Sequence, residues 1–174
     1  MASDNTIDNN EILKFQAMAE EWWDPLGKFK PLHMLNPCRL QYITDQISWH
    51  NSINLDNKDP FNGLNLLDIG CGGGLLSEPM ARMGARVLGA DAAKRNIPIA
   101  QAHAKQSNLQ IDYRHASVED LVSESLKFDV ILNMEIVEHV EDVNLFLKES
   151  SKFLKTNGIM FIATLNKTLK SYVF

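Results

Sequence analysis

One stretch of the sequence, residues 66–74, constrains the fold of this chain more than any other. It reads Leu-Leu-Asp-Ile-Gly-Cys-Gly-Gly-Gly, an apolar run that contains Asp68 and passes into glycines at positions 70, 72 and 74. A strand that turns this sharply into a helix favours glycine, which adopts positive φ readily and lets a ligand approach bare backbone. The stretch therefore predicts a strand–turn–helix unit that binds a nucleotide. An ordinary glycine-rich turn is the alternative.

An acidic residue follows at the distance that such units require. Residues 86–90 are predicted to form a short buried strand, and Asp91 stands at its end. In nucleotide-binding βαβ units, an acid about 20 positions after the first glycine accepts hydrogen bonds from the ribose hydroxyls. The glycine spacing does not fit the dinucleotide fingerprint, because the sixth position counted from Gly70 is Leu75. The sequence thus favours a nucleotide ligand other than NAD.

The composition excludes several classes of protein. The chain has 174 residues, 45% hydrophobic and 22% charged, with a net charge of −5, which is typical of one soluble globular domain. A nucleic-acid substrate is disfavoured, since phosphate binding needs a basic patch and the chain has no basic run. No apolar run reaches the roughly 18 residues that a membrane-spanning helix needs. The two cysteines, Cys38 and Cys71, fit no metal-binding spacing, so a reducing compartment, the cytoplasm, is predicted.

Hydrophobic periodicity divides the chain into a helical N-terminal part and an alternating remainder. Residues 9–22 suit a helix, and a second helix is expected to begin with Asn36 as N-cap and Pro37 as its first residue. Strands are then expected at 64–69, 86–90, 110–114, 128–133 and 158–164, and helices at 74–83, 96–107 and 142–155. This alternation predicts an α/β fold, a mostly parallel sheet with helices on both faces. We expect a helical cap and linker over residues 1–63 and a Rossmann-like core over residues 64–174.

Candidate catalytic residues follow the fourth expected strand, at the carboxyl edge where ligands of such sheets bind. The strand ends at Met134, and Glu135, Glu138 and His139 come next. On an α-helix, positions i, i+3 and i+4 share one face, so two carboxylates and an imidazole are expected to converge. They are candidates to hold a divalent cation or to take the proton of a substrate hydroxyl. On spacing alone, a solvated helix face is the favoured alternative.

Two further residues are candidates for contact with the ligand. Met134 is placed to cover one face of an adenine ring, although a gap-filling core methionine is an equally good interpretation. Arg39 lies near the start of the second expected helix and could donate paired hydrogen bonds to a ligand carboxylate. A surface arginine is the alternative.

The sequence also resembles a known family. Gly-x-Gly-x-Gly behind an acidic residue is similar to motif I of class I S-adenosylmethionine-dependent methyltransferases. The N-terminal block is more specific and resembles the UbiG-type O-methyltransferases of ubiquinone biosynthesis. This similarity is carried by Phe15, Trp22-Trp23-Asp24, Gly27, Phe29-Lys30-Pro31-Leu32-His33, Asn36-Pro37-x-Arg39 and Tyr42-Ile43, and by segments 67–74, 134–140 and Thr164-Leu165-Asn166. It covers nearly the whole chain from about residue 9.

The resemblance implies O-methylation of polyprenylated catechols at two steps of ubiquinone assembly, with S-adenosylmethionine as the methyl donor. It implies that the glycine loop, including Gly70 and Gly72, packs against the amino-acid end and ribose of this cofactor. Asp68 would face the ammonium group, directly or through water. The cofactor contacts implied by the family pattern are Arg39, Gly70, Asp91 and Met134.

The resemblance bears on catalysis as well. Glu135, Glu138 and His139 match a metal-binding pattern of some family members, which implies a Mg²⁺ or Zn²⁺ ion. Without a metal, His139 is expected to act as general base, with Glu135 as the second catalytic candidate. A catechol hydroxyl, with a pKa of about 10 by analogy with tyrosine, needs such help to ionise at neutral pH.

The resemblance also predicts partners for the chain. The polyprenyl tail of the implied substrate predicts peripheral contact with the inner face of the membrane, and an assembly of ubiquinone-biosynthesis proteins is a second expected partner. A non-catalytic cofactor-binding subunit and a methyltransferase for another small phenol are the alternative functions. The class I fold has two further strands, so this sequence is expected to lack them. The fifth strand would then leave an open edge.

Overall fold

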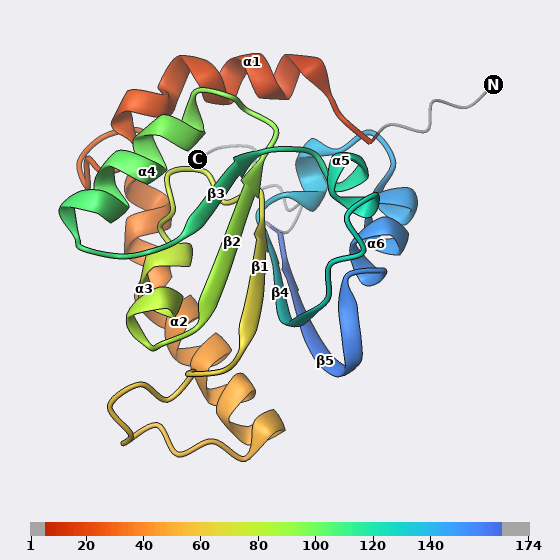
Figure 1. Cartoon of the computed structure of the whole chain (residues 1–174). Helices are drawn as coiled ribbons and strands as arrows, with labels where there is room; N and C mark the ends of the chain where they lie inside the picture. Colours follow the sequence, from red (N-terminus) through yellow and green to blue (C-terminus); the bar gives the residue numbers. More distant parts are fainter. Residues whose placement is uncertain (1–5, 165–174) are drawn as a thin grey trace, which may run out of the picture.

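A parallel sheet forms the centre of the molecule. The computed structural model describes residues 6–164 (Figure 1). Its five strands lie in the order β3-β2-β1-β4-β5, and every pairing is parallel. The strands are β1 (Asn65–Ile69), β2 (Arg86–Asp91), β3 (Asp112–His115), β4 (Phe128–Met134) and β5 (Leu154–Ala163). The α/β fold predicted from the sequence is therefore confirmed.

Helices cover both faces of the sheet and one of its ends. One face packs against α2 (Lys30–Asn51), α3 (Ser77–Arg82) and α4 (Asn96–Gln106), and the other against α5 (Val118–Val122) and α6 (Val143–Ser151). Helix α1 (Asn9–Met18) crosses the end of the sheet where the strands finish, at the top of Figure 1. Two short 3-10 helices, η1 (Ala19–Glu21) and η2 (Val137–His139), complete the described elements.

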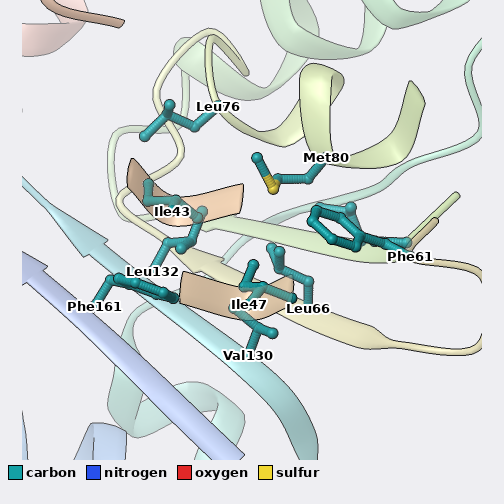
Figure 2. Packing of buried hydrophobic residues seen from close by; sticks show 11 residues of the cluster. Ile43, Ile47, Phe61, Leu66, Leu76, Met80, Val130, Leu132 and Phe161 are labelled. Carbon is teal, nitrogen blue, oxygen red and sulfur yellow. The ribbon is translucent and has the colours of Figure 1, made fainter. Parts of the chain in front are cut away.

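Alternating side chains of the strands build a core on each face. Leu66 packs with Ile43 and Ile47 of α2, as Figure 2 shows, whereas its neighbour Leu67 belongs to the cluster on the opposite face. Such strands appear in sequence as continuous apolar runs, because both faces of a covered parallel sheet are buried. Phe61 is fully buried in the first cluster. The expected linker thus packs onto the core, and burial of such a side chain contributes about 1.5–3 kcal/mol.

Helix α2 begins earlier than the sequence suggested. It starts at Lys30 with Pro31 in its first turn, and Pro37 lies inside the helix instead of opening it. The predicted start at Asn36 is therefore wrong. A proline in a helix interior removes one hydrogen bond and costs about 3 kcal/mol in isolation. We attribute its tolerance to the packing of the following turns against the sheet, a tertiary contribution that local propensity does not contain.

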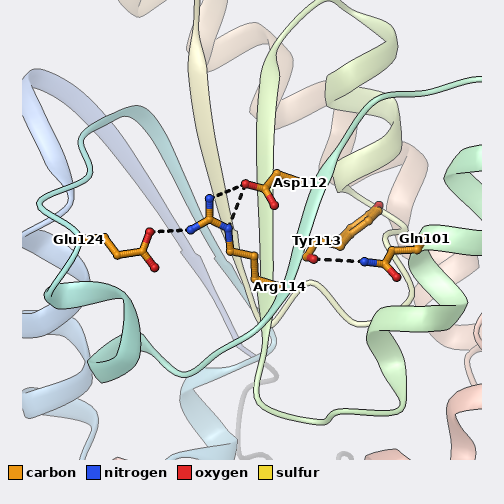
Figure 3. A network of polar contacts seen from close by, with 5 residues as sticks. All are labelled: Gln101, Asp112, Tyr113, Arg114 and Glu124. Atoms are coloured by element: carbon orange, nitrogen blue, oxygen red, sulfur yellow. Dashed lines mark hydrogen bonds and ion pairs between the residues drawn. The ribbon is translucent and has the colours of Figure 1, made fainter.

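Charged side chains mark the exposed edge at β3. In Figure 3, the Arg114 guanidinium lies between Asp112 and Glu124, with its Nε 2.9 Å from Asp112 Oδ2 and its Nη1 2.6 Å from Glu124 Oε2. Gln101 of α4 donates a hydrogen bond to the Tyr113 carbonyl at 3.4 Å. Charges on an edge strand disfavour pairing with another chain.

The other edge of the described sheet is β5, which pairs with β4. Ile162 near its end is about half exposed. Leu165 and Asn166, which carry part of the family resemblance, lie outside the described residues. Within residues 6–164, no helix has the length and apolar character that crossing a bilayer requires.

Candidate functional site

A cavity of about 290 Å³ lies beyond the carboxyl ends of β1, β2 and β4. This is where the topology of an open parallel sheet places a ligand, because the strand ends and the loops that follow them converge there. Helix α1 contributes Glu11, Ile12 and Phe15 to the outer wall. Apart from Gly72, every residue predicted to contact the ligand or act in catalysis lines the cavity: Arg39, Asp68, Gly70, Asp91, Met134, Glu135, Glu138 and His139.

The glycine loop has the backbone that the sequence predicted. Gly70 and Gly72 have φ angles of 73° and 54°, in the left-handed region. A Cβ atom at Gly72 would lie 2.4 Å from the ring of Trp22, and one at Gly70 would lie 2.7 Å from Ile136. The space beside these glycines is therefore filled by side chains of the chain itself. The sequence pattern indicated the positive φ angles and an approach of the ligand to bare backbone, but gave no signal for this packing of Trp22 and Ile136.

Asp91 ends β2 with a carboxylate held by three donors. Its Oδ2 accepts a hydrogen bond from the Gly72 N–H at 2.8 Å, and its Oδ1 accepts from the Ala93 N–H at 2.7 Å and from the Asn96 amide at 3.2 Å. Burial raises the pKa of Asp91, and hydrogen bonds from these same donors oppose the rise. The arrangement favours a carboxylate that stays an acceptor for ligand hydroxyls.

Asp68 is the second buried carboxylate of the site. Its Oδ2 accepts a hydrogen bond from the Ser77 hydroxyl at 2.6 Å. Burial raises the pKa of Asp68 to about 7, the nearby charge of Asp91 adds to the rise, and the Ser77 hydrogen bond opposes it. A cation entering the cavity would stabilise the ionised form of this group.

Arg39 reaches from α2 to the end of β4, where its guanidinium pairs with the carboxylate of Glu135. Their side chains are only 13% and 14% exposed, so Arg39 is not a freely solvated surface arginine. Glu135 has a φ angle of 54°. Its N–H donates to the Ala163 carbonyl at 2.8 Å, which continues the β4–β5 pairing past the end of β4.

The predicted helical face of Glu135, Glu138 and His139 is wrong. The residues that follow β4 form only the single 3-10 turn η2, and Glu135 precedes it with left-handed backbone. Glu135 pairs with Arg39, whereas His139 Nδ1 lies 2.9 Å from Glu11 Oε2. Across residues 6–164, no three or more His, Cys, Asp or Glu side chains are grouped to hold a metal ion. The predicted three-residue metal site therefore does not fit this geometry.

Sequence reasoning did not identify the partners of His139. Glu11 Oε2 lies 2.9 Å from its Nδ1, and the ring of Phe15 meets the imidazole edge-on, with centroids 5.0 Å apart. The same segments are joined by an isolated antiparallel bridge between Ile7 and Val140. The periodicity of residues 9–22 indicated a helix but carried no signal for what that helix covers. Its partner lies more than a hundred residues away in the sequence.

Comparisons with known proteins agree with this architecture. Residues 67–162 match the methyltransferase domain family. Ubiquinone biosynthesis O-methyltransferases of Ruegeria pomeroyi and Pelagibacter ubique are 59% and 62% identical to the chain. Each alignment covers 98% of this chain, and 69% and 70% of the respective relative.

A solved structure adds a likeness of fold. Magnesium protoporphyrin IX methyltransferase from Synechocystis, with bound SAM, aligns with a TM-score of 0.62 over 86% of this chain and 73% of its own, at 19% identity. At that identity the likeness shows the fold alone. The family is shown instead by the close relatives, which match almost all of this chain. The chain belongs to the family of ubiquinone biosynthesis O-methyltransferases.

Proposed function

We propose that this chain binds S-adenosylmethionine in the cavity and catalyses methyl transfer to a hydroxyl group of a polyprenylated catechol in ubiquinone biosynthesis. Family membership supports O-methylation as the reaction. The observation that supports binding in this cavity is the carboxylate of Asp91, which hydrogen bonds hold in place. It lines the same cavity as Arg39 and His139. One cavity thus offers groups for both reactants.

The wall of the cavity fits the charges and hydroxyls of the cofactor. Asp68 is suited to an ammonium group, Asp91 to ribose hydroxyls and Arg39 to a carboxylate. Met134 contributes a polarisable thioether to the same wall, and Gly70 contributes bare backbone. We assign cofactor contact to these five residues, with Gly72 acting from behind through its bond to Asp91.

The chain promotes the reaction mainly by positioning. When bound, the cofactor supplies a methyl group on a sulfonium centre. The residues of the cavity bring the acceptor oxygen into line, and alignment of two reactants lowers the barrier substantially. Helix α1 covers the outer wall and excludes water, which strengthens the electrostatic interactions inside.

We assign the role of general base to His139. Glu11 Oε2 lies 2.9 Å from Nδ1, close enough to orient the imidazole, so we assign the uptake of the proton to the other ring nitrogen. Nε2 can then take the catechol proton, as in other sites where a carboxylate orients a histidine. Glu135 holds Arg39 at the end of β4 and is the second candidate for a catalytic role. No step is assigned to a metal ion.

The experiment that tests the function uses purified protein and a short-chain polyprenyl catechol. We expect methyl transfer that depends on S-adenosylmethionine, and weaker transfer to the same catechol without its prenyl chain. Asp91→Ala should weaken cofactor binding by about 2–4 kcal/mol in calorimetry, because charge-assisted hydrogen bonds are lost. Asp45→Ala, at an exposed position of α2, is the matched control.

Three results would count against the proposal. Cofactor affinity unchanged by Asp91→Ala would remove the ribose assignment. Equal rates with both catechols would favour a methyltransferase for another small phenol. Tight cofactor binding without turnover would favour a non-catalytic subunit.

A further inference from the structure

A chain of hydrogen bonds joins the N-terminal segment to Asp91. Trp22 Nε1 donates to Asn96 Oδ1 at 2.9 Å, and the Asn96 amide nitrogen donates to Asp91 Oδ1 at 3.2 Å. All three side chains are buried, and Asn96 is only 1% exposed. The indole ring is itself fixed, because it stacks on Phe29 with centroids 3.7 Å apart.

The direction of these bonds has a chemical cause. An asparagine amide presents an acceptor on one side and donors on the other, and either orientation fits the same space. An indole N–H can only donate, so Trp22 selects the orientation in which the oxygen faces Trp22. The NH₂ group is thereby turned toward Asp91. The opposite orientation would set the amide oxygen against the carboxylate.

Trp22 also supports the second oxygen of Asp91. The Trp22 ring lies 2.4 Å from the position that a Cβ atom on Gly72 would take. The N–H of Gly72 in turn donates to Asp91 Oδ2. One side chain therefore braces the donors to both carboxylate oxygens, through Asn96 on one side and through packing on Gly72 on the other.

The count of acceptor sites shows what this bracing leaves for a ligand. An ionised carboxylate offers about four lone-pair sites. Gly72, Ala93 and Asn96 occupy three of them, two on Oδ1 and one on Oδ2. The remaining site lies on Oδ2, and Asp91 lines the cavity. The carboxylate is thus fixed in one orientation with an acceptor to spare.

We propose that Trp22 and Asn96 are positioning residues that fix the Asp91 carboxylate so that its remaining acceptor site recognises a ribose hydroxyl of the ligand. The inference rests on the proposed binding of S-adenosylmethionine and extends it to residues that do not touch the reacting atoms. Trp22 lies outside residues 67–162, which match the methyltransferase domain family. The N-terminal segment thus takes part in ribose recognition as well as covering the site.

The test measures discrimination between two ligands. The dissociation constants of S-adenosylhomocysteine and its 2′,3′-dideoxy analogue are compared by calorimetry in each variant. Trp22→Phe keeps the aromatic ring on Phe29 but removes the N–H. We expect it to reduce the preference for the ribose form by about three- to tenfold, the effect of one hydrogen bond, with little change for the dideoxy analogue. If Trp22 had only a structural role, Trp22→Phe would weaken the binding of both ligands alike.

The adjacent tryptophan provides a matched control. Trp23 Nε1 donates to the Gly73 carbonyl at 2.9 Å and has no bond to Asn96 or Asp91 among those described. Trp23→Phe should leave the preference within about twofold. Asn96→Leu removes the middle member of the chain of bonds and should lower the preference as Trp22→Phe does. The double variant should be no worse than Trp22→Phe alone, because that change removes both the bond to Asn96 and the ring atoms that pack on Gly72.

The outcomes separate this inference from the proposed function. A preference that is lost in Asp91→Ala but unchanged in Trp22→Phe overturns the positioning role and leaves the cofactor assignment standing. The positioning role is also overturned if Trp22→Phe weakens the binding of both ligands equally. The same holds if Trp23→Phe lowers the preference for the ribose form as much as Trp22→Phe does. Wild-type protein that binds neither ligand, or does not prefer the ribose form, overturns both the cofactor assignment to Asp91 and this inference.

Discussion

At the scale of single residues, the site contains a buried carboxyl group, Asp68, whose burial lowers the stability of the fold. Burial raises the pKa of Asp68 from 3.8 to about 7. The folded protein therefore retains a proton at this residue over a pH range in which the unfolded chain has lost it. Stability falls wherever the folded state binds more protons and the pH rises. The contribution of Asp68 to stability should thus decline between about pH 4 and 7 and then level off.

Replacing this carboxyl by an amide separates stability from binding. Asp68→Asn keeps an acceptor for Ser77 but carries no charge, so it should raise the free energy of unfolding at pH 8 by about 1–3 kcal/mol. It should also weaken the binding of S-adenosylhomocysteine and remove the rise in affinity that we expect of the wild-type protein between pH 6 and 8. Urea unfolding and calorimetry measure the two effects, with exposed Asp45→Asn as control. Unchanged stability at pH 8 would contradict the argument.

Two glycines with left-handed backbone allow packing to be measured apart from strain. Gly63 has a φ of 92° and nothing near its missing Cβ, whereas a Cβ on Gly72, with a φ of 54°, would meet Trp22. Gly63→Ala should cost about 1–2 kcal/mol for the backbone alone. Gly72→Ala should cost more, because Trp22 must also move. Denaturant unfolding compares the two variants, and equal losses would show that Trp22 does not press on the loop.

The role of His139 is tested by chelation and substitution. Under the general-base proposal, EDTA leaves turnover intact, and His139→Ala lowers kcat by about 10²–10⁴-fold while cofactor affinity is kept. Glu138→Ala, which changes a residue of the same 3-10 turn, should leave turnover near normal. Loss of activity with EDTA and its return with Mg²⁺ or Zn²⁺ would restore the metal hypothesis and remove the base from the mechanism.

At the scale of elements, the sequence predicted what local patterns encode. The runs 64–69 and 128–133 became β1 and β4 almost unchanged, since strands buried on both faces are apolar throughout. Pro37 was misjudged because its helical position depends on packing of α2 against the sheet. The segment after β4 was also misjudged. Glu135 has left-handed backbone and Asp142 caps the next helix, so only the short 3-10 turn η2 lies between them.

The covering role of the N-terminal elements can be followed by hydrogen exchange. Residues 20–45 include Trp22 and Arg39, both of which line the cavity. Binding of S-adenosylhomocysteine should therefore slow amide exchange in this range and in α1, since an occupied cavity opens less often. Residues 52–63 contribute no side chain to the cavity and provide the internal reference. Equal exchange with and without ligand would leave the N-terminal segment as packing alone.

At the scale of the whole molecule, the site could be predicted as a set of residues but not as a set of pairs. The order of strands and glycines indicated which side chains would reach the carboxyl edge of the sheet. The pairs Arg39–Glu135 and Glu11–His139 join elements that periodicity treats separately. Each depends on where the N-terminal helices dock, and that follows from complementary surfaces rather than from local sequence.

Peripheral contact with membranes is a prediction for the molecule as a whole. A polyprenyl tail stays in the bilayer, so an enzyme acting on its head group must approach the surface. We expect the protein to co-sediment with phosphatidylcholine vesicles containing a polyprenyl catechol, and less with anionic vesicles, because its net charge is −5. Vesicles without the catechol are the control. Failure to co-sediment with any of these vesicles would contradict the expectation.

The contacts that Thr6 and Ile7 make with distant residues beside the cavity have a consequence for biosynthesis. Thr6 bonds to Glu119, 113 residues further along, and Ile7 pairs with Val140. These contacts cannot form until Glu119 and Val140 have been synthesised and have left the ribosome. Contacts between residues distant in sequence also form slowly. Thr6 and Ile7 are thus made well before the residues on which they dock. During synthesis, Trp22 lacks Asn96 and Trp23 lacks His103 until those residues have been made, so a nascent chain exposes this aromatic surface over that interval.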